Sequence, residues 1–198
     1  MKNRKFAKVA LIALAMVLVC IVSVVGTVAY LTSKSAVVTN TFTVGNVTIT
    51  LDEADVDEAG EVIENADRVT ENTYKLIPGE TYTKDPTVHV AAGSESSWLF
   101  VKVENGIEAI EASTTVAEQM AADWTLVVGT DNIYAYKTTV KGGDDIVVFE
   151  NFTIKGDVDN DTLASYNDKT IVVQALAVQS TGFDSAADAF AAVGGWPA

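Results

Sequence analysis

Residues 170–179 read TIVVQALAVQ, and this stretch decides the fold class. Apolar residues alternate along it and it is rich in Val, which is typical of a β-strand. Eight more segments share this pattern and are bounded by Gly, Pro, Asp or Asn: residues 36–44, 46–51, 73–76, 87–91, 98–104, 124–128, 133–140 and 145–154. Many short strands separated by turns predict an all-β fold, specifically an antiparallel jelly-roll sandwich with one or two short helices.

Two segments differ from this pattern and predict the short helices. Residues 107–123 repeat apolar side chains at helical spacing. Residues 185–193 are rich in Ala, begin at Ser185 as a candidate N-cap and are followed by two glycines. Residues 52–71 carry nine acids and a single cation, Arg68. We expect this acidic segment to be a solvated, mobile insertion.

The N-terminal segment has the three parts of a secretion signal. Residues 1–8 carry four cations and no acid, and residues 9–25 are apolar except for Ser23. Thr27 and Ala29 suit the signal peptidase, so we predict cleavage after Ala29, with Tyr30 the next candidate. The chain then divides into a signal peptide (residues 1–29), an N-terminal segment (residues 30–44) and a folded domain (residues 45–198).

The apolar run has two other interpretations besides a cleaved signal. An uncleaved anchor helix stays open, because the run of 17 residues lies at the lower limit for crossing a bilayer, roughly 17–25. A lipoprotein is the second, because Cys20 lies in the run. Val19 precedes Cys20 where lipoprotein processing needs a small residue, which favours Cys20 as an ordinary apolar residue.

The charge balance limits the partners. The 198 residues contain 13 Lys and Arg against 27 Asp and Glu, a net charge of −14, and cleavage after Ala29 makes it −18. Phosphate backbones and anionic lipid headgroups need a basic surface, so we expect no nucleic-acid partner and no membrane contact beyond the signal peptide. Cleavage also removes the only cysteine, Cys20. An exported domain without disulfides suits the extracellular matrix or cell surface of a bacterium.

Candidate catalytic residues are scarce. His89 is the only histidine, whereas a zinc-protease helix needs two and a Ser-His-Asp triad needs one beside a serine. No glycine-rich nucleotide-binding motif occurs either, so we predict no enzymatic activity and no cofactor. Asp157, Asp159 and Asp161 alternate as calcium ligands do, but the glycine and glutamate of an EF-hand are absent. A polar loop is the favoured interpretation of these aspartates.

Five segments, taken in order, resemble the TasA and camelysin family of secreted proteins. They are GTVAYLT at 26–32, NTFTVGNV at 40–47, PGETYTKDPTV at 78–88, WLFVKV at 98–103 and TIVVQALAVQ at 170–179. The first is similar to the junction that the SipW-type signal peptidase cuts in that family. The third is similar to a family block that reads PGE, three variable residues and KDP. Together these segments span nearly the whole chain.

The resemblance implies a jelly-roll domain, export by the signal peptidase, and assembly into fibres of the biofilm matrix. Fibres of this kind form by donor-strand exchange, with further copies of the chain or related matrix proteins as partners. Transferred to this sequence, the donor is residues 31–44, with Leu31, Val37, Val38, Phe42 and Val44 as its apolar side chains.

Other interpretations of structure and function stay open. A flexible leader followed by an ordinary first strand explains residues 31–44 equally simply. A non-polymerising adhesion or accessory module at the cell surface is a second functional class. A secreted metallopeptidase of camelysin type is a third, and the single histidine makes it the least favoured of the three.

Overall fold

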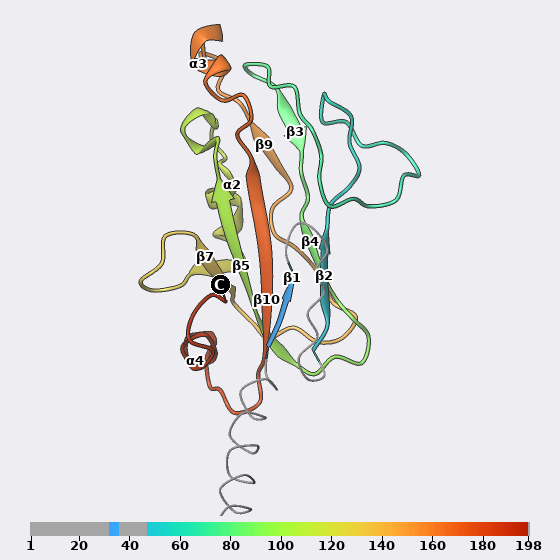
Figure 1. Cartoon of the computed structure of the whole chain (residues 1–198), viewed down its shortest axis with the longest axis vertical. Helices are drawn as coiled ribbons and strands as arrows, with labels where there is room; N and C mark the ends of the chain where they lie inside the picture. The colour runs from blue at the N-terminus through green and yellow to red at the C-terminus, as the bar shows by residue number, and fades with distance from the viewer. Residues whose placement is uncertain (1–31, 36–46, 198) are drawn as a thin grey trace, which may run out of the picture.

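Antiparallel strands make up most of the structure, a computed structural model that describes residues 32–35 and 47–197 (Figure 1). The prediction of a β-rich fold with a few short helices is confirmed. The strands are β1 Thr32–Ser35, β2 Ile49–Asp52, β3 Thr81–Thr83, β4 Thr87–Val90, β5 Ser97–Asn105, β6 Trp124–Leu126, β7 Ile133–Tyr136, β8 Asp145–Val147, β9 Asn151–Thr153 and β10 Ile171–Gln179. The helical elements are the 3-10 helix η1 Glu108–Ile110 and the α-helices α2 Val116–Met120, α3 Asn160–Ala164 and α4 Ala186–Ala192.

One layer is a five-stranded sheet in the order β1-β10-β5-β7-β6. Its centre is the long β5–β10 pair, which stays in register from Ser97 opposite Gln179 to Asn105 opposite Ile171. Both strands are rich in Val and other residues that favour extended backbone. β1 lies at one end of this strand order, and of the described strands it pairs with β10 alone.

A second layer lies beside this sheet (Figure 1). It consists of a three-stranded sheet in the order β2-β4-β8 and of the separate pair β3-β9. The main core lies between the two layers, where Ile49, Leu51 and Val88 of the second layer cluster with Val101 and Val173 of the first. Burial of these alternate side chains explains why β2, β4 and β5 show a period-two pattern in the sequence.

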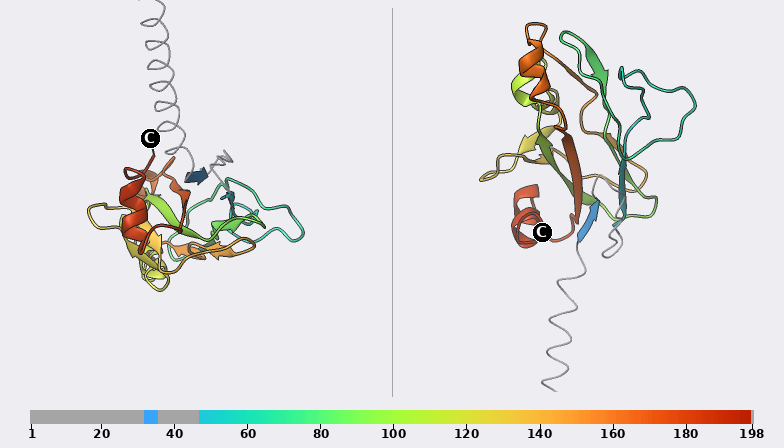
Figure 2. Two further views of the ribbon diagram at one scale, coloured as in Figure 1. Left: turned by 90° about the horizontal axis from the view of Figure 1, so that it is seen from below. Right: turned by 45° about the horizontal axis from the view of Figure 1, so that its top comes forward.

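The opposite face of the five-stranded sheet is covered by α4 (Figure 2). Phe190 of α4 packs on Phe100 of β5 with ring centroids 5.2 Å apart, and Leu176 and Val178 of β10 belong to the same cluster. Ser185 caps the helix by accepting a hydrogen bond from the backbone N–H of Asp188, so the predicted cap is confirmed. β10 is therefore buried on both of its faces.

Two predicted strands differ from the structure. Residues 73–76 form no strand. Tyr74 instead packs edge-on against Tyr82 and Phe152, with centroids 5.9 and 5.2 Å away, so alternate burial without strand pairing produced the pattern. Residues 145–154 divide into β8, which pairs with β4, and β9, which pairs with β3. The short strand β3 was not predicted.

The predictions for residues 107–123 and for the acidic segment also need correction. Residues 107–123 form η1 and α2 rather than one helix, and Glu111 between them forms an isolated bridge with Ile154. In the acidic segment, Glu53 and Val56 are buried and Glu53 pairs with Val69 across an isolated bridge, so a fully solvated insertion is wrong. Within the described part of the chain, no helix has the length and apolarity needed to span a membrane.

Candidate functional site

The N-terminal strand β1 lies along the outer edge of β10, which is the edge opposite β5. β1 pairs with it antiparallel, from Thr32 opposite Val178 to Ser35 opposite Ala175. The β10 side chains in this stretch are fully buried, with Ala175 in the core between the layers and Val178 under α4. Backbone N–H and C=O groups that are buried in this way need hydrogen-bond partners. β1 supplies them along this stretch of β10.

β1 covers only part of that edge. Its register partners run from Ala175 to Val178, whereas β10 begins at Ile171. Among the described residues, residues 171–174 pair with β5 on one side and with no strand on the other. A cavity of about 20 Å³ lies beside this open stretch, lined by Ile171 and Val173 of β10 and by Leu51 and Lys84 of the second layer.

Most residues of the predicted N-terminal site cannot be placed against this edge. Those outside the described ranges are Ala29, Tyr30, Leu31, Val37, Val38, Phe42 and Val44. β1 is the described portion of the N-terminal segment, and it pairs within its own chain and also lies close to β2. The structure thus places Thr32–Ser35 along β10 of the first layer and close to β2 of the second.

A buried ion pair between Lys84 and Glu53 lines the same small cavity from the second layer. Lys84 Nζ donates to Glu53 Oε2 at 2.6 Å, and only 10% of the lysine side chain and 6% of the glutamate side chain are exposed. Asn72 Nδ2 donates to the other oxygen of Glu53 at 3.0 Å. The Lys84 ammonium also lies 5.9 Å from the ring centroid of Tyr74. Each Glu53 oxygen therefore has a donor, as a buried carboxylate requires.

Arg68 extends the network toward solvent. Its Nε donates to Asp52 at 2.5 Å and its Nη1 donates to Asp85 at 2.9 Å. Asp85 in turn accepts from the backbone N–H of Ala54 at 2.7 Å. The single cation of the acidic segment thus joins that segment to the second sheet.

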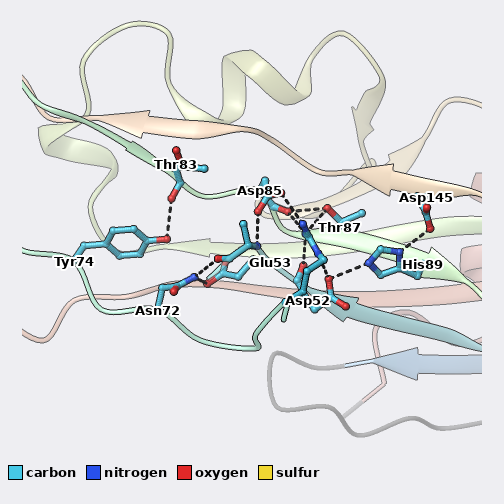
Figure 3. Close-up of polar contacts among 11 residues, drawn as sticks. Asp52, Glu53, Asn72, Tyr74, Thr83, Asp85, Thr87, His89 and Asp145 are labelled. Carbon is cyan, nitrogen blue, oxygen red and sulfur yellow. Dashed lines mark hydrogen bonds and ion pairs between the residues drawn. The ribbon is translucent and has the colours of Figure 1, made fainter. Parts of the chain in front are cut away.

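His89 of β4 lies between two carboxylates on neighbouring strands (Figure 3). Its Nε2 is 2.9 Å from Asp52 of β2, and its Nδ1 is 2.6 Å from Asp145 of β8. Burial lowers the pKa of His89, but the hydrogen bonds and charges of Asp145 and Asp52 together outweigh it, so the pKa lies above its ordinary value. The ring therefore favours the charged form and links the three strands of the second sheet.

The partners of His89 and Arg68 in this polar network were not predicted from the sequence. The role of Asp159 was not predicted either. Asp159 is the N-cap of α3 and accepts from the backbone N–H of Thr162 at 2.7 Å, a role that the polar-loop interpretation did not include. This hydrogen bond is the main reason why the pKa of Asp159 is lowered. Asp157 and Asp161 are exposed beside it. Across residues 32–35 and 47–197, no three metal-ligating side chains lie close enough together to hold an ion.

Both sites are assemblies of ordinary structural interactions. The β10 edge can bind an extended chain through its backbone, and the polar network holds the acidic segment against the second sheet. Comparison with known proteins finds no matching family model, no matching curated protein and no matching solved structure. The resemblance to the TasA and camelysin family therefore stays a prediction from the motifs.

Proposed function

We propose that this chain is a secreted structural subunit of extracellular fibres in a bacterial biofilm matrix. In the proposed fibre, the N-terminal segment of one copy completes the sheet of the next copy, within a jelly-roll architecture. The observation that carries the proposal is the outer edge of β10, which lies between two cores and which, among the described strands, pairs with one from the N-terminal segment. An extended peptide that joins such an edge gains backbone hydrogen bonds and pockets for alternate side chains.

The register of β1 supports a donor longer than β1 itself. Ser35 lies opposite Ala175, so a donor that continues in the same register sets Val37 opposite Val173. Val173 faces the core between the layers and lines the small cavity at the open end of the edge. A valine side chain at this point of the donor adds apolar contact where the described chain leaves space.

The proposed contact also explains growth into a filament. The donor and the acceptor edge are different surfaces of one chain, so the contact is head-to-tail and leaves a free donor and a free edge at the two ends. Cleavage after Ala29 frees the donor from the membrane-inserted signal, so assembly begins only after export. A net charge of −18 then opposes any close contact that lacks a specific interface.

Electron microscopy and sizing of two purified chains test the proposal. The first chain begins at Leu31, and the second begins at Gly45 and lacks the donor. We expect filaments from the first and none from the second, because the second leaves the β10 edge without a strand. Monomers from both chains under varied salt, calcium and pH would count against self-assembly.

A cysteine pair shows whose strand occupies the edge. Ser33 and Ala177 are register partners, and directly paired residues on antiparallel strands are close enough for a disulfide. In the chain beginning at Leu31, which lacks Cys20, Ser33→Cys with Ala177→Cys should give a covalent ladder of multimers after oxidation of filaments. The single variants Ser33→Cys and Ala177→Cys are the matched controls and should give dimers at most.

A non-polymerising surface or accessory module is the second candidate. It is favoured by the pairing of β1 with β10 of its own chain. The same cysteine pair separates the two candidates, because an intramolecular strand gives only cross-linked monomers. That result would replace the fibre proposal by the accessory role.

A further inference from the structure

A second pocket, separate from the edge of β10, lies between the end of β5, the start of β7 and α2. Its volume is about 380 Å³, within the range of small-molecule sites. Four acidic residues line it, and no lysine or arginine from the described chain does: Glu104, Glu108, Glu111 and Asp131. Its remaining wall is largely apolar and includes Val103, Val116 and Met120.

Glu111 is the unusual member of this group, because it is 2% exposed. Its Oε2 accepts a hydrogen bond from Asn105 Nδ2 at 3.0 Å. Its Oε1 is buried and has no well-aligned hydrogen-bond donor among the described residues, although the backbone N–H of Val116 lies near the carboxylate. A buried carboxylate oxygen without a donor is unfavourable, so this atom is ready to accept a hydrogen bond from a ligand.

Electrostatics at the pocket favour a positively charged ligand. Burial raises the pKa of Glu111, and the negative charges of Glu108 and Glu118 add to this effect. The hydrogen bonds from Asn105 and from the Val116 N–H lower the pKa, but by less. At the rim, Lys102 forms an ion pair with Glu104. Glu108 and Asp131 are exposed, and no described cation pairs with them. A bound cation stabilises the ionised form of Glu111 and interacts with both free rim carboxylates.

We propose that this pocket binds an alkylammonium group, with the ammonium donating to Glu111 Oε1 and the alkyl chain packed against Val103, Val116 and Met120. The absence of any three clustered metal ligands in the described chain favours such an organic cation over a metal ion. The exposed Glu108 and Asp131 suit a second positive or polar group at the far end of the ligand. This chemistry belongs either to a free polyamine or to a lysine side chain of a partner.

Isothermal titration calorimetry of the full chain in non-ionic detergent with 1,5-diaminopentane tests the proposal. Glu111→Gln keeps the shape of the side chain but removes its charge, and we expect binding to weaken by about tenfold or more. Glu95→Gln changes an exposed acid outside the pocket and should leave the affinity unchanged. Pentan-1-ol, which has no ammonium, should not bind.

The ligand series identifies the source of the ammonium. Tighter binding of Nα-acetyl-lysine methylamide than of 1,5-diaminopentane assigns the pocket to a lysine of a partner, and the reverse order assigns it to a free polyamine. Equal binding of the diamine to the wild type and to Glu111→Gln overturns the proposal. Binding of Ca²⁺ that depends on Glu111, without binding of either amine, overturns it as well. Each outcome is independent of whether the chain forms fibres.

Discussion

At the scale of single residues, Lys84 and Glu53 form the most buried charged contact that is described. Lys84 pairs with Glu53 of the acidic segment, and Arg68 of that segment pairs with Asp85, the residue after Lys84. Buried ion pairs contribute little net stability, but they strongly penalise the loss of one partner. The contact therefore fixes the position of the acidic segment more than it stabilises the fold.

Replacing Lys84 by Met should lower the free energy of unfolding by about 3–5 kcal/mol, because it leaves the Glu53 charge buried without its cation. Adding Glu53→Gln removes that charge, so the double variant should recover most of the loss. Urea denaturation followed by tryptophan fluorescence measures both effects. Lys75→Met, at an exposed lysine, should change stability by less than about 0.5 kcal/mol. Equal losses in the two lysine variants would contradict the role of the buried pair.

His89 should make stability depend on pH. Its pKa is higher in the folded chain than its ordinary value, so protonation favours the folded state. This contribution is complete below the unfolded pKa of about 6.5 and is lost as the pH rises through the higher folded pKa. The stability difference between wild type and His89→Gln should therefore be largest near pH 6 and smallest near pH 9 in urea denaturation at each pH. A difference that stays constant would mean that the ring acts through packing alone.

The residue-level network could not be predicted from the sequence for a geometric reason. His89 was identified, but its partners Asp52 and Asp145 lie on two other strands, and only the strand register brings them to it. The lone cation Arg68 among nine acids was the one available signal of a fixed contact. The cap at Asp159 was missed because Asp and Asn are as common in loops as at helix starts.

At the scale of elements, α4 is the cover that buries the second face of β10. Replacing Phe190 by Ala should lower the free energy of unfolding by about 3 kcal/mol, because Phe190 packs on Phe100 and is 9% exposed. Val128→Ala removes an apolar side chain that is 99% exposed and should change stability by less than about 0.5 kcal/mol. Urea denaturation compares the two variants. A small loss in Phe190→Ala would mean that α4 is not part of the cooperative core.

Elements were predictable where burial and strand pairing agree. β5 and β10 are long, rich in Val and paired along their whole length, so pattern and structure coincide. Residues 73–76 alternate because Tyr74 packs on Tyr82 and Phe152, and this burial needs no strand partner. β3 was missed because three residues are too few for a pattern. The break between β8 and β9 was missed because Val148 and Phe149 continue the apolar run.

At the scale of the whole molecule, the net charge should control the rate of the proposed assembly. Copies that each carry −18 repel one another at long range, and salt shortens that repulsion from about 30 Å at 0.01 M to about 8 Å at 0.15 M. Light scattering of the chain beginning at Leu31 should therefore show faster assembly at about 0.15 M than at about 0.01 M NaCl. The chain beginning at Gly45 should show no assembly at either concentration. Slower assembly in salt would indicate attraction between charged patches instead.

The long pairing of β5 with β10 also sets the order of events during biosynthesis. Within this pair Ser97 lies opposite Gln179 and Asn105 lies opposite Ile171, so β5 and β10 cannot pair on a nascent chain that ends before these residues. Contacts so distant along the chain form slowly, because a long loop must close first. A polypeptide that stays unfolded while it is being synthesised is one that a narrow translocation channel can still thread. The topology leaves the β5–β10 pair open until β10 has been synthesised, which suits the proposed export of the chain.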